Sequence, residues 1–245
     1  MHQFHIERLI PLEVNGVDVS ISAASVAMIG ASAVAVWFMS SAMKPAALVP
    51  GRTQLVAENF FSFIRGMVKD ATGAEGVAKF FPFVFSLFIF IFMANMIGMF
   101  PYFFTSTGQL VVPALMALLV FFTVIVIGFA KNGLKFFKLF APSGVPLVIL
   151  PFVVLIELIS FFSRPISHSV RLWANIFAGH ILLKVFAGFV PAMASVGGLG
   201  ILGSVLPLAM TVGLYGLEFL VAALQAYVFA LLTCIYLNDA LHPGH

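Results

Sequence analysis

Long apolar runs separated by short polar stretches dominate the chain, and this pattern predicts membrane-spanning helices. An α-helix rises about 1.5 Å per residue, so about 20 apolar residues are needed to cross a hydrocarbon core about 30 Å thick. In the first half of the chain the pattern predicts three such spans, at 21–43, 80–104 and 110–130. The second and third belong to one uncharged stretch, which the polar residues 101–109 divide with a predicted turn.

The two remaining apolar regions, 146–190 and 201–239, are much longer than one span needs. As a single helix, 151–190 would measure about 60 Å, about twice the thickness of the hydrocarbon core. We therefore expect two long helices that are steeply tilted or broken, with Pro165 as a candidate bend. Joined through the segment 191–200, they would form an antiparallel hairpin that could lie along a curved partner.

A different pattern occupies residues 52–72, where apolar side chains recur at helical spacing and charged ones line the opposite face. The charged face consists of Glu58, Arg65 and Lys69. This pattern predicts a helix that lies on the membrane surface and does not cross it. Together the patterns predict an all-α polytopic membrane protein with about five crossings and one surface helix. We expect a single membrane domain over 1–245, with a short outside segment, 1–20, before the first span.

The amino-acid composition is that of a membrane protein and not of a soluble domain. Hydrophobic residues make up 62% of the chain and charged residues 9%, and the mean hydropathy is +1.14. Soluble domains average about 25% charged residues, so the composition excludes that class. The chain has one cysteine, Cys234, which excludes an internal disulfide. No cleaved signal is expected, because no basic segment leads directly into an apolar one at the start.

Lysine and arginine are distributed unevenly between the two sides of the predicted topology. One side carries Lys44, Arg52, Arg65, Lys69, Lys79, Lys131, Lys135 and Lys138. The opposite side has only Arg8, since the loops 101–109 and 191–200 contain no basic residue. Basic residues favour the cytoplasmic side, which places the N-terminus outside and the C-terminus in the cytoplasm. The net charge of +3 therefore reflects topology, and we expect no nucleic-acid partner.

Charged and polar side chains form a stripe on the first helix of the predicted hairpin. At about 100° per residue, these side chains fall within about 60° of one another. They are Glu157, Arg164, His168, Arg171 and Asn175. A charged side chain at the centre of a bilayer costs about 3 kcal/mol or more, so the stripe is expected to face protein or a water-filled cavity.

The second helix of the hairpin carries fewer polar residues, and Glu218 and Gln225 lie on one of its faces. In an antiparallel hairpin of continuous helices, residues at equal depth have a roughly constant sum of residue numbers. One register of the hairpin then places the two residues of each of three pairs at the same depth: Arg171 with Gln225, His180 with Glu218, and Glu157 with Asp239. On the span 80–104, Asn95 could line an outer aqueous route or pack against another helix.

These residue types suit proton transfer in two separate stretches. Glutamate and histidine can exchange protons, whereas arginine keeps its proton because its pKa is above about 12. By depth, His180 and Glu218 lie toward the outside, Arg171 in the middle and Glu157 toward the cytoplasm. A straight proton path would be interrupted at Arg171 unless another carrier takes the proton at that level.

Other interpretations stay open at this point. His168 fits a simple hydrogen bond to a carbonyl or a serine, and Asn175 and Gln225 fit helix–helix contacts. Arg164 could pair with Glu157, seven residues away. A stand-alone secondary transporter is an alternative function, but the chain shows no inverted repeat. A structural anchor would not need an arginine inside a span, and a voltage sensor would need several at three-residue spacing.

Two segments of the predicted hairpin resemble a known family. The sequence SRPISHSVRLWANIFAGHILL contains Arg-Leu-x-Ala-Asn-x-x-Ala-Gly-His at 171–180. The sequence LEFLVAALQAYVFALLTCIYLNDA contains Glu-x6-Gln-Ala-Tyr-x-Phe at 218–229. Together these motifs resemble the a subunits of rotary F-type ATP synthases. The resemblance covers the whole chain, including the surface helix and the sequence NMIGMFPY.

The resemblance implies an ion-translocating stator subunit that is not an enzyme by itself and uses no cofactor or metal. It implies that Arg171 faces the carboxylates of a c-subunit ring and separates two offset proton half-channels, with Gln225 packed beside it. His180 and Glu218 match the outer half-channel, and Glu157 matches the cytoplasmic one. The remaining candidates for the proton path are Asn175, His168 and Asn95.

The same resemblance implies partners and a location. The expected partners are the c-subunit ring, the b-type subunits of the peripheral stalk, the other ATP synthase subunits and the lipid bilayer. Histidine at 180 with glutamate at 218 resembles the alphaproteobacterial and mitochondrial members of the family. We expect the inner membrane of a bacterium, with the mitochondrial inner membrane as the alternative.

Overall fold

The computed structural model of the chain is built almost entirely from helices. It describes residues 8–10, 13–14, 17–18, 20–42, 51–100, 105–141, 145–146 and 148–241. Its long helices are α1 (Ala23–Ala42), α2 (Arg52–Gly98), α3 (Val111–Asn132), α4 (Leu150–Ala194) and α5 (Gly198–Leu241). Its short 3-10 helices are η2 (Ser106–Gly108) and η3 (Gly133–Leu139). Within these residues five helices are long and apolar enough to cross a membrane, which confirms the predicted class.

Among the described residues before α1 there are four short strands. They are β1 (Arg8–Ile10), β2 (Glu13–Val14), β3 (Val17–Asp18) and β4 (Ile21–Ser22). β1 pairs with β4, and β2 pairs with β3, both antiparallel. Sequence patterning does not predict them, because strands of two or three residues are too short to show the alternation of half-buried strands.

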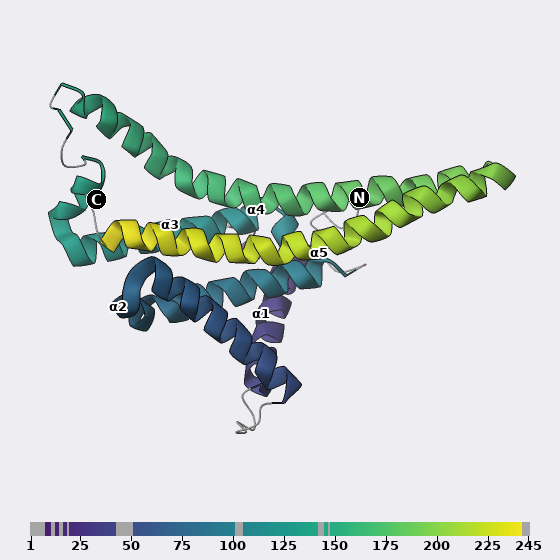
Figure 1. Ribbon diagram of the computed structural model, residues 1–245, viewed down its shortest axis with the longest axis horizontal. Coiled ribbons are helices and arrows are strands. Elements are labelled where there is room, and N and C mark those ends of the chain that lie inside the picture. Colours follow the sequence, from purple (N-terminus) through teal and green to yellow (C-terminus); the bar gives the residue numbers. More distant parts are fainter. Residues whose placement is uncertain are drawn as a thin grey trace.

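α4 and α5 form the predicted long hairpin. They have 45 and 44 residues, so each is about 67 Å long. Both are continuous, and α4 passes through Pro165 without a break, so the broken alternative does not apply. The two helices lie side by side and meet at the turn 195–197 (Figure 1). Figure 1 also shows that α4 is curved, with its first turns diverging from the end of α5.

α2 contains the predicted surface helix and the second span in one element. The two parts join at Gly73, whose φ of +74° is a conformation that glycine adopts readily. Here the chain turns back on itself (Figure 1), so the first part packs against the second. The Phe60 ring lies 5.2 Å from the Phe92 ring, and Ile64 and Val68 are fully buried. Helical spacing predicts this helix, but the chain itself covers much of its apolar face.

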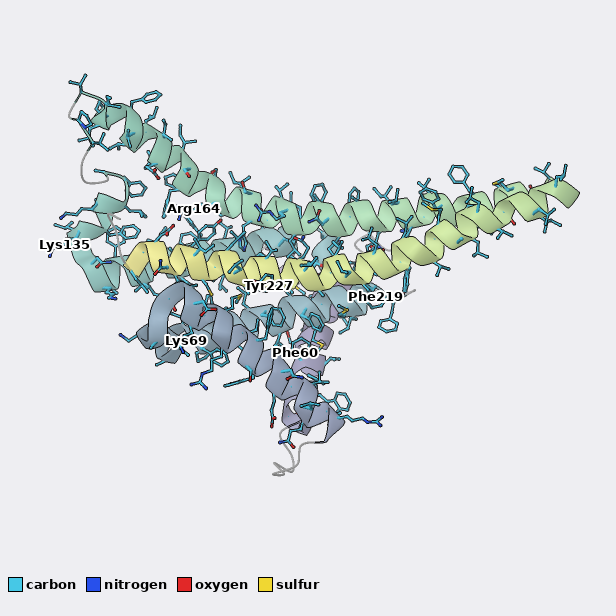
Figure 2. All side chains as sticks on the ribbon, in the orientation of Figure 1. Phe60, Lys69, Lys135, Arg164, Phe219 and Tyr227 are labelled. Atoms are coloured by element: carbon cyan, nitrogen blue, oxygen red, sulfur yellow. The ribbon has the colours of Figure 1, made fainter. Side chains whose placement is uncertain are left out.

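The core lies where the second part of α2, α3 and α5 meet, with α4 along one side. Small residues on α5 allow close packing, and Ala222, Ala226 and Ala230 are fully buried. Aromatic side chains fill much of the remaining space along the helices (Figure 2). At the end of α3 the Phe136 ring of η3 folds back over Gly128. This contact anchors η3 to the last turns of α3.

We expect Gly128→Ala to destabilise the protein, because the added Cβ would overlap the Phe136 ring. Overpacking of this kind costs about 1–3 kcal/mol. For a chain of this size, the unfolding midpoint should fall by about 2–12 °C, measured by circular dichroism in detergent. Gly30→Ala on α1 is the control, because its Cβ would meet no atom within 4 Å. Equal shifts in the two variants would contradict the packing of Phe136 on α3.

Candidate functional site

A buried acid–base pair joins α4 to α5. The Nδ1 atom of His180 lies 3.6 Å from Oε1 of Glu218, and the exposed fractions of these side chains are 9% and 4%. The predicted hairpin register places these two residues at the same depth, and the structure brings them together. Gly179 makes the approach possible, since a Cβ at this position would lie 2.8 Å from Oε1 of Glu218.

Thr105 orients the imidazole of His180. Its hydroxyl lies 2.9 Å from the Gly98 carbonyl and 3.3 Å from Nε2 of His180. A hydroxyl has one proton, and the Gly98 carbonyl can only accept it. Thr105 Oγ1 therefore accepts a hydrogen bond from His180 Nε2–H. By this assignment from the hydrogen-bond pattern, the Nδ1 atom of the neutral ring carries no proton and faces Glu218.

Further polar atoms surround this pair. Asn95 on α2 is buried and donates through Nδ2 to the Ala222 carbonyl at 3.1 Å, which supports the packing role considered for it. Tyr215 on α5 donates to the Met99 carbonyl at 2.9 Å. Several buried polar atoms form no hydrogen bond to the described part of the chain: both carboxylate oxygens of Glu218, Thr107 Oγ1, Asn95 Oδ1 and Gln109 Nε2. They can bond a mobile donor or acceptor.

His168 lies in a separate apolar environment. It is buried, and its ring centroid is 3.7 Å from that of Phe229 on α5. Neither ring nitrogen has a hydrogen-bond partner among the described residues. His168 and His180 are twelve residues apart, or about 18 Å along α4. The structure therefore does not bring His168 into the cluster around Glu218.

Arg164 forms an ion pair with Asp239 of α5. The Nη1–Oδ2 distance is 2.8 Å, and the guanidinium also lies over the Tyr236 ring, 4.9 Å from its centroid. Figure 2 shows Arg164 on the side of α4 that faces α5. Arg164 thus pairs across the hairpin, and the alternative pairing with Glu157 is wrong. The prediction that Glu157 lies at the same depth as Asp239 also fails, because Asp239 pairs with Arg164 and the first turns of α4 diverge from the end of α5 (Figure 1).

Arg171 lies on the surface of α4, although neighbouring residues are buried. Its side chain is exposed, whereas Leu172 next to it is 1% exposed. It forms no ion pair with any residue that the structure describes. Large apolar side chains are also exposed on α4: Phe162, Ile166 and Val170. The predicted stripe therefore divides, with His168 inside the protein and Arg171 outside.

The other predicted polar residues occupy intermediate positions. Asn175 on α4 and Gln225 on α5 are half-buried, and so is Glu157 near the start of α4. No side-chain hydrogen bond is formed between these three within the described structure. Along α4 the order of these residues is Glu157, Arg171, Asn175 and His180, so Arg171 lies between Glu157 and His180.

Known proteins identify the family of this chain. A family model described as "ATP synthase A chain" matches residues 23–238. The chain belongs to the ATP synthase A chain family. ATP synthase subunit a of Rhizobium johnstonii is 58% identical over 243 residues, which cover 99% of this chain and 97% of that protein.

Two further relatives in this family match over nearly the same length. ATP synthase subunit a of Agrobacterium fabrum is 57% identical over 244 residues, covering 100% of this chain and 98% of the relative. The subunit of Parvibaculum lavamentivorans is 56% identical over 245 residues, covering 100% and 94%. The predicted resemblance to the a subunits is thereby confirmed.

Sequence reasoning missed Thr105 at this ATP synthase A chain site and gave Asp239 the wrong partner. Thr105 belongs to the polar run TSTGQ, which predicts only a turn between two spans. A polar run between long apolar helices was a usable signal, because its side chains must find partners inside the bundle. Asp239 was recognised as a polar residue at the end of α5, but the curvature of α4 determines which basic residue reaches it.

The Arg164–Asp239 pair should show a measurable coupling free energy. We expect Arg164→Gln and Asp239→Asn each to lower the stability of the purified protein, and the double variant to lose less than the sum. Both side chains are partly exposed, so the coupling should be about 1 kcal/mol. The measurement is a double-mutant cycle of thermal unfolding.

The matched control cycle pairs Arg65→Gln with Asp239→Asn. Arg65 lies exposed on α2 and makes no ion pair with Asp239 in the described structure. This cycle should be additive within about 0.5 kcal/mol. Additivity in the Arg164 cycle as well would contradict the ion pair.

Proposed function

We propose that this chain is the ion-translocating stator subunit of a rotary F-type ATP synthase. It carries protons along two offset half-channels, and Arg171 separates them at the surface of a moving ring of c subunits. The observation that carries the proposal is the contrast between Arg171, exposed and without an ion pair in the described chain, and the buried His180–Glu218 pair. The names of the relatives support the same assembly.

An exposed arginine in the middle of a membrane helix requires a partner. Facing lipid, the charge would cost about 3 kcal/mol or more. A carboxylate on a neighbouring subunit removes this cost through a charge-assisted hydrogen bond. The exposed apolar residues Phe162, Ile166 and Val170 on α4 suit contact with an apolar helix bundle. The curved outer edge of α4 (Figure 1) fits a cylindrical partner, such as a ring of c subunits.

The outer half-channel ends at Glu218. Protons arriving from the outside reach the His180–Glu218 pair, whose atoms lie 3.6 Å apart. Because Thr105 holds Nε2–H, the Nδ1 atom of His180 that faces Glu218 takes up an arriving proton and passes it to the Glu218 carboxylate. The polar atoms of Thr107 and Asn95 border the route with further hydrogen-bonding groups. From Glu218 the proton passes to a ring carboxylate.

The inner half-channel begins at Glu157. This residue is fourteen positions before Arg171, or about 21 Å along α4, whereas His180 is nine positions after it, about 13 Å. A ring carboxyl must release its proton before it passes Arg171, so protons cross from one half-channel to the other only when the ring rotates. Arg171 cannot relay the proton itself, since a guanidinium group stays protonated in proteins. Rotation and proton flow are thereby coupled, with Gln225 and Asn175 flanking the arginine.

The subunit works only within its complex. Its partners are the c ring, the b-type subunits of the peripheral stalk and the other subunits of the synthase, where the catalytic reaction takes place. It uses no cofactor of its own. The bacterial relatives support the inner membrane of a bacterium as its location. The distribution of lysine and arginine supports an outside N-terminus and a cytoplasmic C-terminus. We assign His168, packed on Phe229, to helix packing.

Arg171→Ala should reduce ATP-driven proton pumping at least about tenfold, because the barrier and the docking charge for the ring carboxylate are lost. The measurement is quenching of a pH-sensitive dye in inverted membrane vesicles. Native gels check that the complex still assembles. The control is Lys135→Ala, an exposed lysine of η3 (Figure 2), which should pump normally. Normal pumping by assembled Arg171→Ala complexes would exclude this role.

Thr105→Val should slow passive proton flow through the membrane sector several-fold, whereas Thr105→Ser should keep it. Valine has nearly the same shape but cannot bond Nε2 of His180, and an unbonded buried group costs about 1–3 kcal/mol. Serine retains the hydroxyl. Flux is measured in vesicles stripped of the catalytic sector, normalised to the amount of assembled complex. Equal flux in the valine variant and the unchanged protein would show that Thr105 does not orient the proton carrier.

A further inference from the structure

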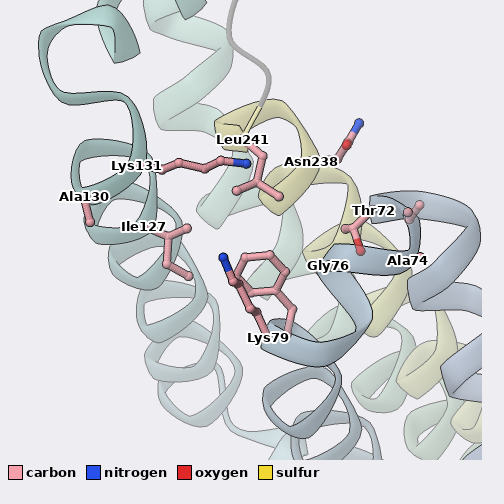
Figure 3. A pocket seen from close by; sticks show the side chains of 12 residues that line it. Thr72, Ala74, Gly76, Lys79, Ile127, Ala130, Lys131, Asn238 and Leu241 are labelled. Carbon is pink, nitrogen blue, oxygen red and sulfur yellow. The ribbon is translucent and has the colours of Figure 1, made fainter.

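A pocket of about 880 Å³ lies where the kink of α2 meets the ends of α3 and α5. It is formed by α2 around its kink, by the last turn of α3 and by the end of α5 (Figure 3). The apolar part of α2 that can span a membrane begins at Gly76, and α5 ends at Leu241. Both residues line the pocket. The pocket therefore lies at the level where the membrane core meets the polar boundary.

Two lysines supply the charge of this pocket. Lys79 of α2 and Lys131 of α3 extend their ammonium groups into the same space (Figure 3). Neither forms an ion pair with a residue that the structure describes. Asp70 lines a different pocket, and Asp239 is bound to Arg164. The described pocket lining thus has two positive charges and no carboxylate.

Lys131 is not required to cap the end of α5. The side chain of the next residue, Asn132, already donates through Nδ2 to the Ala240 carbonyl at 2.7 Å. The amide of Asn238 adds a neutral polar group to the pocket wall. These groups together can bind an anion with several oxygen atoms, such as a phosphate.

The rest of the pocket wall is apolar. Phe80, Ile127, Ala130 and Leu241 line it on the side that continues into the membrane-spanning parts of the helices. A soluble phosphate ion gains nothing from such a wall, whereas a lipid places its acyl chains there. Basic pockets between helices at the cytoplasmic boundary are suited to anionic head groups.

We propose that this pocket binds the head group of an anionic phospholipid, with the phosphate between Lys79 and Lys131. The bound lipid links the kink of α2 to the ends of α3 and α5 at this boundary. This site is independent of the proposed proton path, because none of its lining residues belongs to the His180–Glu218 cluster.

The test uses the intact ATP synthase complex in phosphatidylcholine nanodiscs, titrated with fluorescent phosphatidylglycerol. The pocket variant is Lys79→Gln with Lys131→Gln. The control is Lys135→Gln with Lys138→Gln, which removes the same charge from exposed lysines of η3 that do not line the pocket. We expect the Kd of the pocket variant to rise about tenfold and that of the control to change little.

Two results would overturn the proposal. Equal Kd values for the pocket variant and the control would show that the lysines bind lipid only as a diffuse surface charge, or that another subunit covers the pocket. Full displacement of the labelled lipid by inorganic phosphate at constant ionic strength would identify a free anion as the ligand. ATP-driven proton pumping is measured on both variants in parallel, and normal pumping shows that each complex is correctly folded.

Discussion

Inside a bilayer a charged side chain is stable only beside a partner or water, and this constraint organises α4 and α5. Arg164 satisfies this constraint by pairing with the carboxylate of Asp239 on the neighbouring helix. His180 and Glu218 lie against each other in the interior. Arg171 is exposed and has no ion pair within the described part of the chain. A second molecule is needed to balance that charge, and the proposed ring of c subunits would supply the carboxylate.

The curvature of α4 determines which of these pairs form. Near the middle of the hairpin the helices run together, and the simple antiparallel register correctly levels His180 with Glu218. Toward its beginning α4 bends away (Figure 1), so Asp239 meets Arg164 and Glu157 lies farther out. The same bend therefore closes the Arg164–Asp239 ion pair and leaves Glu157 apart from the His180–Glu218 pair.

Apolar periodicity was sufficient to predict the five spans, the helix at 52–72 and the long hairpin, because the membrane requires long apolar helices with internally bonded backbones. It could not predict that α2 folds back at Gly73, since that depends on packing between Phe60 and Phe92. Nor could it separate buried His168 from exposed Arg171. These residues are three positions apart, and only the position of α5 decides which of them it covers.

The close approach of the buried acid–base pair depends in turn on small residues that are not titratable. Gly179 leaves room for the Glu218 carboxylate, and a methyl group there would push it away from His180. On α5, Ala222 and Ala226 let α2 approach closely enough for Asn95 to bond a backbone carbonyl. Close helix packing of this kind excludes lipid from the site, so the polar side chains face only each other and whatever hydrogen-bonding species enters from outside. The geometry of the His180–Glu218 pair is thus set by the distance between helix backbones as much as by the two titratable residues themselves.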